Sequence, residues 1–261
     1  MLAFITGATS GIGEAYATKL AQQGYDLIIT GRRMHMLNRI ASRLINDYHI
    51  NVETIKAELS ADNELDNLVE RIEQIDAIDI LVNNAGFGSP YNFLEKNFTG
   101  QEKMIIVHIV APLKLIYAAL PRMIKRGHGV IINVSSVSGK TPLPTGATYG
   151  ATKSFMQIFS ESLYLENIDS NILIQTLCPG FTKTNFHDRI GGQNQYKNKG
   201  FIRWMTPEDV VEISLKNLKK GKVICVPGFW NNVLWILADI VPRNIYYKII
   251  SRMAKRELLF E

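Results

Sequence analysis

Cysteine is scarce in this chain. Only Cys178 and Cys225 occur among 261 residues, too few for the disulfide framework that holds small secreted domains together. The sequence therefore favours a reducing compartment, and we expect no metal site.

Long apolar runs are also missing. The longest uncharged stretch near the C-terminus, residues 223–238, has 16 residues and contains a proline, a glycine and two asparagines. A membrane-spanning helix needs about 20 predominantly apolar residues, so this stretch does not predict one. The N-terminus reaches Thr6-Gly7 after a short apolar segment, without the basic and apolar regions of a secretory signal. We expect a cytoplasmic protein that does not span a membrane.

Charge is present but unevenly placed. The chain is 46% apolar and 20% charged, with a formal charge of +5, an ordinary globular composition that excludes disorder and coiled coils. Residues 1–196 carry a net charge of −1 and residues 197–261 a net charge of +6. No helix-turn-helix, zinc knuckle or stacked-aromatic motif accompanies the basic C-terminal quarter, so we expect no nucleic-acid partner.

Apolar segments of strand length alternate with amphipathic segments of helix length along the whole chain. The strand-like runs, such as Val130-Ile131-Ile132, show no alternation of apolar and polar residues, which is typical of strands buried on both faces. We therefore predict a single α/β domain, a Rossmann-type doubly wound parallel sheet with helices on both faces. Strands are predicted at residues 2–6, 26–30, 51–57, 79–83, 130–134, 171–177 and 222–226, and helices at 11–23, 34–48, 61–74, 101–126, 148–167 and 207–219.

A glycine-rich turn joins the first predicted strand to the first helix. Glycines permit a tight turn and close approach of the backbone to a pyrophosphate, and the helix N-terminus offers unpaired N–H groups to the phosphates. A plain tight turn is the alternative, but the strand–turn–helix context favours dinucleotide binding. The predicted cofactor-binding residues of this turn are Gly7, Thr9, Ser10, Gly11, Ile12 and Gly13.

Two arginines, Arg32 and Arg33, follow the second predicted strand. An NAD enzyme places Asp or Glu there, against the ribose 2′-hydroxyl. Guanidinium groups instead suit a 2′-phosphate, because arginine pairs with phosphate in a bidentate manner. The sequence favours NADP(H) over NAD(H), although both arginines could simply solvate the next helix.

A tyrosine and a lysine, Tyr149 and Lys153, are spaced i and i+4 on a predicted helix and so share one face. A tyrosine hydroxyl has a pKa of about 10, and a neighbouring ammonium is expected to lower that pKa. Ser136 follows the strand at 130–134, at the carboxyl edge where open α/β sheets bind ligands, and its hydroxyl could hold a carbonyl oxygen. The Tyr–Lys spacing alone occurs often by chance, so the combination with the glycine turn carries the hypothesis.

Together these motifs resemble the short-chain dehydrogenase/reductase family over nearly the whole chain. The resemblance implies a seven-stranded sheet of order 3-2-1-4-5-6-7, with Tyr149 as general acid, Ser136 orienting the substrate carbonyl, and Lys153 binding ribose. The subgroup most similar in motif order is named after 3-oxoacyl and steroid reductases. Further cofactor contacts implied by the resemblance are Glu58, Leu59, Asn84, Ala85, Gly86, Pro179, Gly180, Thr182 and Thr184.

Two positions depart from the family pattern. Glu58 stands where the family has Asp, which adds one methylene. His108 stands where the family has its fourth catalytic residue, an Asn that anchors a water linked to Lys153. A neutral imidazole offers one donor and one acceptor, so His108 is a substitute relay, the cause of an impaired enzyme, or a core histidine with satisfied hydrogen bonds. We favour the relay, because the other motifs are intact.

The substrate pocket and the C-terminus complete the expectations. Apolar residues after the fourth strand and before Tyr149 are expected near the substrate, and the polar segment 185–205 is expected to form a lid. Residues 229–261 are predicted to be a basic amphipathic helical extension of the catalytic domain, residues 1–228. The extension either packs on the protein or a partner subunit, or touches a membrane surface. The expected substrate-pocket residues are Phe87, Tyr91, Phe93, Leu143 and Pro144.

We therefore predict an NADPH-dependent oxidoreductase that reduces a small-molecule ketone or aldehyde, of 3-oxoacyl or steroid type, to an alcohol. The family resemblance implies a homodimer or homotetramer. The alternative is an NADP-binding regulatory or scaffold protein in which His108 impairs turnover.

Overall fold

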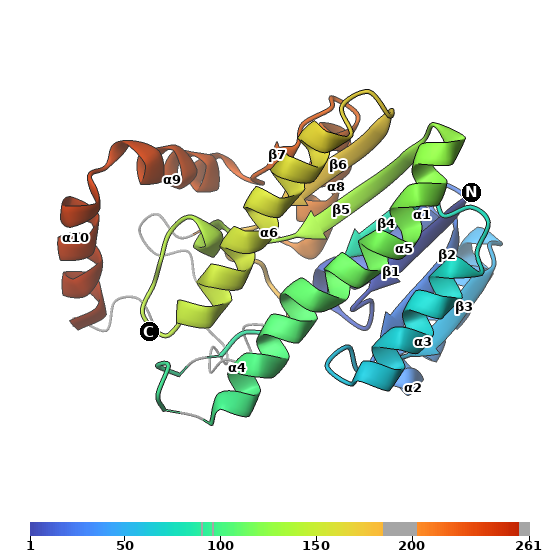
Figure 1. Ribbon diagram of the computed structural model, residues 1–261, viewed down its shortest axis with the longest axis horizontal. Helices are drawn as coiled ribbons and strands as arrows, with labels where there is room; N and C mark the ends of the chain where they lie inside the picture. Colours follow the sequence, from blue (N-terminus) through green and yellow to red (C-terminus); the bar gives the residue numbers. More distant parts are fainter. Residues whose placement is uncertain (90, 96, 185–202, 256–261) are drawn as a thin grey trace.

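The computed structural model describes the chain except residues 90, 96, 185–202 and 256–261. It contains one fully parallel seven-stranded sheet of order β3-β2-β1-β4-β5-β6-β7 (Figure 1). The predicted fold class and strand order are confirmed. The strands are β1 (Leu2–Thr6), β2 (Asp26–Gly31), β3 (Val52–Lys56), β4 (Ile80–Asn83), β5 (Gly129–Val134), β6 (Ile172–Leu177) and β7 (Ile224–Cys225).

Helices cover both faces of this sheet (Figure 1). One hydrophobic cluster joins the sheet to α1, α2 and α8, and a second joins the opposite face to α3, α5 and α6. The helical segments are α1 (Gly11–Ala21), α2 (Met34–Tyr48), α3 (Asp62–Glu73), α4 (Phe98–Ile105), the π-helical η1 (Ile106–Val110), α5 (Ala111–Arg126), the 3₁₀ turn η2 (Val137–Gly139), α6 (Ala147–Glu166), α8 (Pro207–Leu218), α9 (Phe229–Ile240) and α10 (Arg243–Lys255).

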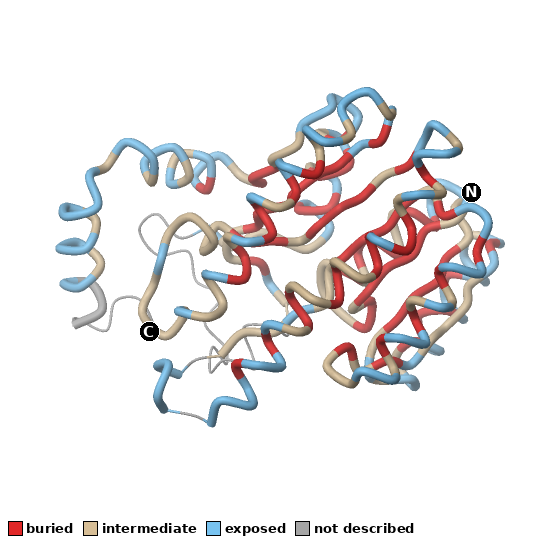
Figure 2. Tube along the Cα trace, in the orientation of Figure 1, coloured by how far each residue is buried: buried red, intermediate tan, exposed pale blue. Residues whose placement is uncertain are grey.

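Neighbouring residues of the central strands point to opposite faces and are apolar on both. Phe4 of β1 lies in the cluster under α3 and α5, whereas Ile5, the next residue, lies in the cluster under α1 and α8. This explains the uninterrupted apolar runs in the sequence. Figure 2 shows the buried residues concentrated in the strands and on the inward faces of the helices.

One long helical rod, formed by α4, η1 and α5, crosses the sheet. Its 29 residues have a window of mean hydropathy 1.9, long and apolar enough to cross a membrane, but half of that window is buried inside the protein. Many of its buried residues, including Leu115 and Met123, belong to the core cluster under α3. In this fold the rod is a core helix.

The C-terminal extension begins as two helices. In Figure 1, α9 leaves the β7 end of the sheet and α10 turns away from it, so that both lie outside the sheet sandwich. In α10 the side chains of residues 243–252 are described, and almost all of them are exposed. The predicted helical character of this extension is confirmed.

Candidate active site

The glycine turn lies between β1 and α1, as the sequence predicts. Gly7 and Gly11 have φ angles of 69° and 62°, a left-handed conformation that favours glycine. A Cβ on Gly7 would lie 2.8 Å from the Cα of Ala85, and one on Gly13 would collide with the Asn84 amide and the Gly7 carbonyl. The backbone therefore leaves no room for side chains here, which forms a cradle that fits a pyrophosphate.

Asn84 holds this turn against the end of β4. Its side-chain amide donates to the carbonyls of Thr6 (2.9 Å) and Gly7 (3.1 Å). The backbone N–H groups of Asn84 and Ala85 both donate to the Thr6 hydroxyl at 3.0 Å. The two predicted cofactor segments are thus fixed to each other, and the Asn84 amide is occupied in fixing them.

The two arginines after β2 occupy different places. Arg33 reaches back to the glycine turn, where Nη2 donates to the Thr9 hydroxyl (2.9 Å), the Thr9 carbonyl (3.2 Å) and the Ser10 hydroxyl (3.2 Å). Arg32 pairs with Glu58 at 3.2 Å. Partial burial opposes ionisation of Glu58, but hydrogen bonds from Ser60 and Arg32 outweigh it and lower the pKa of this carboxyl. Arg33 therefore lies against the glycine turn, whereas Arg32 lies beside Glu58, after β3.

Leu59, the other predicted contact after β3, is buried in the core under α3. Only its backbone can meet a nucleotide.

Ser136, Tyr149 and Lys153 come together at the carboxyl end of β5. The Ser136 and Tyr149 hydroxyls are hydrogen-bonded, and the Lys153 Nζ lies 5.7 Å from the centroid of the Tyr149 ring. Ser136 and Lys153 are buried and Tyr149 is half-buried. The i and i+4 spacing on α6 places the two α6 side chains on one face as predicted.

The pKa values at this cluster differ from the expected ones. Burial raises the pKa of Tyr149 to about 12, although the Ser136 hydrogen bond opposes the rise. Burial lowers the pKa of Lys153 to about 8. The net lowering of the Tyr149 pKa that the sequence predicts is not found, because burial raises this pKa. The Lys153 ammonium donates to the Val134 carbonyl at 2.8 Å.

His108 lies in the π-helical segment η1 and is 2% exposed. Its Nε2 accepts from the Phe87 N–H at 3.0 Å, so the proton of the neutral ring sits on Nδ1, which lies 2.9 Å from the Thr152 hydroxyl. That hydroxyl donates in turn to the Tyr149 carbonyl at 2.8 Å. Burial, and next the Lys153 charge, hold the pKa of His108 well below its usual range. His108 is therefore a neutral imidazole with both ring nitrogens bonded to the protein.

The segment after β6 meets the glycine turn from the other side. A Cβ on Gly11 would lie 2.8 Å from the Thr184 methyl group, so Thr184 lies beside the turn as the resemblance implies. Thr182 bridges to Met205 and its hydroxyl donates to the Gly180 carbonyl at 3.1 Å. The Pro179 carbonyl accepts from the backbone N–H of Val137, which ties this segment to the loop that carries Ser136.

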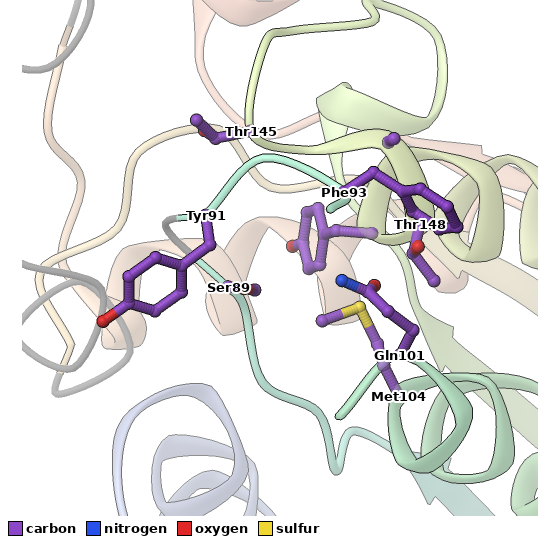
Figure 3. A pocket seen from close by; sticks show the side chains of 9 residues that line it. Ser89, Tyr91, Phe93, Gln101, Met104, Thr145 and Thr148 are labelled. Atoms are coloured by element: carbon purple, nitrogen blue, oxygen red, sulfur yellow. The ribbon is translucent and has the colours of Figure 1, made fainter. Parts of the chain in front are cut away.

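A pocket opens beside Tyr149. Figure 3 shows Phe93, Gln101, Met104 and Thr148 converging on it, with Tyr91 further out. Tyr91 and Phe93 are predicted substrate-pocket residues, whereas Phe87, Leu143 and Pro144 do not line this pocket. Most of the predicted lid lies outside the described residues.

Sequence reasoning missed the part of the pocket wall supplied by α4. Gln101 and Met104 are buried and lie seven and four residues before His108, on the helix face that carries it. That spacing was the available signal. Ser89, Thr145, Ala147 and Thr148 also line the pocket.

Comparison with known proteins identifies the family of this chain. The sequence model described as short chain dehydrogenase matches residues 1–195. The chain belongs to the short-chain dehydrogenase family. It is therefore an oxidoreductase by family, and the predicted family membership is confirmed.

Relatives of this short-chain dehydrogenase include reductases of acyl thioesters. Very-long-chain 3-oxoacyl-CoA reductase of Mus musculus is 30% identical over 97% of this chain and 79% of its own length. The 3-oxoacyl-[acyl-carrier-protein] reductase of Aquifex aeolicus is 32% identical over 87% of this chain and 96% of its own. Among solved structures, a short-chain dehydrogenase from Sphingobium yanoikuyae in complex with NADPH is 30% identical, with a TM-score of 0.84 over 96% of this chain and 95% of its own.

Proposed function

We propose that this short-chain dehydrogenase is an NADPH-dependent reductase of apolar ketones or aldehydes. The observation that carries the proposal is the convergence of the Ser136 and Tyr149 hydroxyls with Lys153 beside a glycine cradle. Two acyl-thioester reductases among its relatives support an acyl-type carbonyl substrate.

The residues around the glycine turn fit NADP(H). Gly7 and Gly13 form a cradle that a Cβ would fill, and the guanidinium groups of Arg32 and Arg33 after β2 are donors of the kind that a 2′-phosphate needs. An NADPH-bound relative of 30% identity supports the assignment. Bound NADPH supplies the hydride that the reduction consumes.

Tyr149 delivers the proton in this proposal. Its pKa of about 12 keeps the hydroxyl protonated at neutral pH, so a proton is ready for the oxygen of a carbonyl held by Ser136. Lys153 carries its ammonium below about pH 8, which stabilises the negative charge left on Tyr149 after transfer.

His108 acts through position in this proposal, as neither ring nitrogen faces a free path for a proton. It links the backbone of Phe87 to the α6 turn that carries Tyr149. This role differs from the proton relay that we favour from the sequence. In this role His108 does not prevent Ser136, Tyr149 and Lys153 from catalysing the reaction. A regulatory or scaffold protein remains the alternative function, distinguished by NADPH binding without turnover.

The assembly and location are also proposals. We propose a catalytic domain at residues 1–228 with residues 229–261 as its extension, in a cytoplasmic homodimer or homotetramer that contacts a membrane surface peripherally. Exposed apolar residues on α5 and α6, Tyr117 (83% exposed), Phe155 (40%) and Ile158 (63%), support subunit contact.

The test is NADPH consumption against a panel of 3-oxoacyl thioesters, steroids and medium-chain ketones and aldehydes. We expect turnover with NADPH, weaker turnover with NADH, and loss of turnover in Tyr149→Phe, which keeps the ring and removes the proton donor. Unchanged turnover in Tyr149→Phe contradicts the mechanism. Binding of NADPH with no turnover on any substrate favours the scaffold alternative.

A further inference from the structure

The two C-terminal helices present an apolar surface that the rest of the described chain does not cover. Neither α9 nor α10 packs along its length against another helix or strand in the part of the chain that the structure describes. Apolar side chains that would be buried in a core are exposed here: Phe229 (74%), Ile236 (55%), Ile240 (68%), Ile245 (51%) and Ile249 (48%). Within each helix these five residues lie four or seven positions apart, so they share one face of α9 and one face of α10.

Basic side chains border this apolar surface on α10. Lys248 and Arg252 are exposed and lie within one turn of Ile245 and Ile249, and Arg243 begins the same helix. The sequence of α10 contains no acidic residue. A helix with apolar side chains bordered by basic ones binds an interface between acyl chains and anionic headgroups.

The same helices hold the loop that precedes Tyr149. The Tyr246 hydroxyl on α10 donates to the Pro142 carbonyl at 2.7 Å. Lys140 at the start of that loop pairs with Asp239 of α9 and lies 4.4 Å above the ring of Trp235. Thr145, three residues beyond Pro142, lines the pocket beside Tyr149. Figure 1 shows α10 next to this loop and on the same side of the molecule as the pocket-forming end of α4.

We propose that α9 and α10 dock this enzyme on an anionic lipid surface. Through the contacts of Tyr246 and Lys140, the same helices hold the loop at residues 140–146 in position to receive substrate drawn from that surface. The apolar face enters the acyl boundary, and the basic residues of α10 meet the headgroup phosphates. The part of the inference that concerns substrate rests on the proposed reductase function, whereas docking itself does not.

The docking test is sedimentation of the full chain with phosphatidylcholine vesicles, with and without added phosphatidylglycerol, in the absence of substrate. We expect binding to the anionic vesicles that weakens at high salt. The double variant Ile245→Glu/Ile249→Glu should lose at least about tenfold in vesicle affinity, because two isoleucines that enter the acyl boundary in this proposal are replaced by side chains with the same charge sign as the lipid. Ile168→Glu, a matched change at a residue that is 58% exposed in the turn after α6, should bind as the unsubstituted protein does.

Light scattering of the same variants tests whether a second copy of the chain, and not lipid, covers this surface. A loss of oligomer mass in the double variant, with vesicle affinity unchanged, assigns this surface to a second copy of the chain and overturns the proposal. Equal binding to neutral and anionic vesicles overturns the role of the basic residues.

The coupling test uses Tyr246→Phe, which removes only the hydroxyl that bonds to Pro142. We expect anionic vesicles to increase turnover of a long-chain carbonyl substrate, and Tyr246→Phe to reduce that increase while vesicle binding is retained. An equal increase in both proteins refutes the coupling. Vesicle binding with no turnover on any substrate refutes the reductase function but leaves docking intact.

Discussion

The depressed pKa of Lys153 predicts a pH-dependent gain in stability. The unfolded chain titrates this lysine near 10.5 and the folded protein near 8, so between these values the unfolded state binds more protons. Stability must therefore rise as pH rises through this window. Each unit of difference is worth about 1.4 kcal/mol, so the whole window is worth about 3 kcal/mol, of which roughly 1 kcal/mol is gained by pH 9.

The assay is urea unfolding of the protein and of Lys153→Met at several pH values from 7 to 10, without nucleotide. Methionine keeps an unbranched buried chain and removes the charge, so other titrating groups cancel when the two curves are subtracted. The difference in unfolding free energy should move by about 1 kcal/mol in favour of the lysine protein between pH 7 and pH 9. Lys114→Met, which removes a more exposed ammonium paired with Asp66, is the control for the loss of a lysine charge as such. A flat difference for Lys153→Met refutes the desolvation argument.

Three further substitutions test the site. Arg32→Ala should raise the KM for NADPH by about tenfold and leave that for NADH nearly unchanged; equal effects on both would refute 2′-phosphate recognition. His108→Leu should lower the free energy of unfolding, measured with urea, by about 1 kcal/mol, because it leaves the part-buried Phe87 N–H unpaired. His108→Asn should restore stability, and no loss in His108→Leu would refute the bonding. Gly13→Ala should abolish NADPH fluorescence enhancement, because its Cβ meets the Asn84 amide; retained binding would refute the cradle.

The fold is predictable from the sequence because local and tertiary requirements agree. Strands such as β1 and β5 read as continuous apolar runs because both of their faces are buried, and the glycine turn is fixed by backbone contacts that exclude side chains. The ends of elements are less predictable. The predicted strand 222–226 shrinks to Ile224–Cys225, because at the sheet edge pairing with β6 sets its length.

Electrostatics at the site are not predictable in the same way. Spacing alone puts Tyr149 and Lys153 on one helix face, but whether the ammonium lowers the tyrosine pKa depends on burial and on the Val134 carbonyl, 19 residues away. Likewise the partners of His108 come from a loop 21 residues before it and a helix 44 residues after it. A local sequence pattern cannot show contacts between residues that lie so far apart along the chain.

In the proposed mechanism, the protonation states of this cluster are those from which reduction begins. At neutral pH Tyr149 holds its proton and His108 is neutral, so Lys153 supplies the positive charge among these three residues. Proton donation to a carbonyl oxygen starts from this arrangement and leaves a tyrosinate whose charge Lys153 opposes. Oxidation of an alcohol must instead begin by removing a proton from a hydroxyl with a pKa of about 12. Because the tyrosinate is scarce at neutral pH, burial keeps Tyr149 in the form that donates a proton, although the raised pKa also makes it a weaker acid.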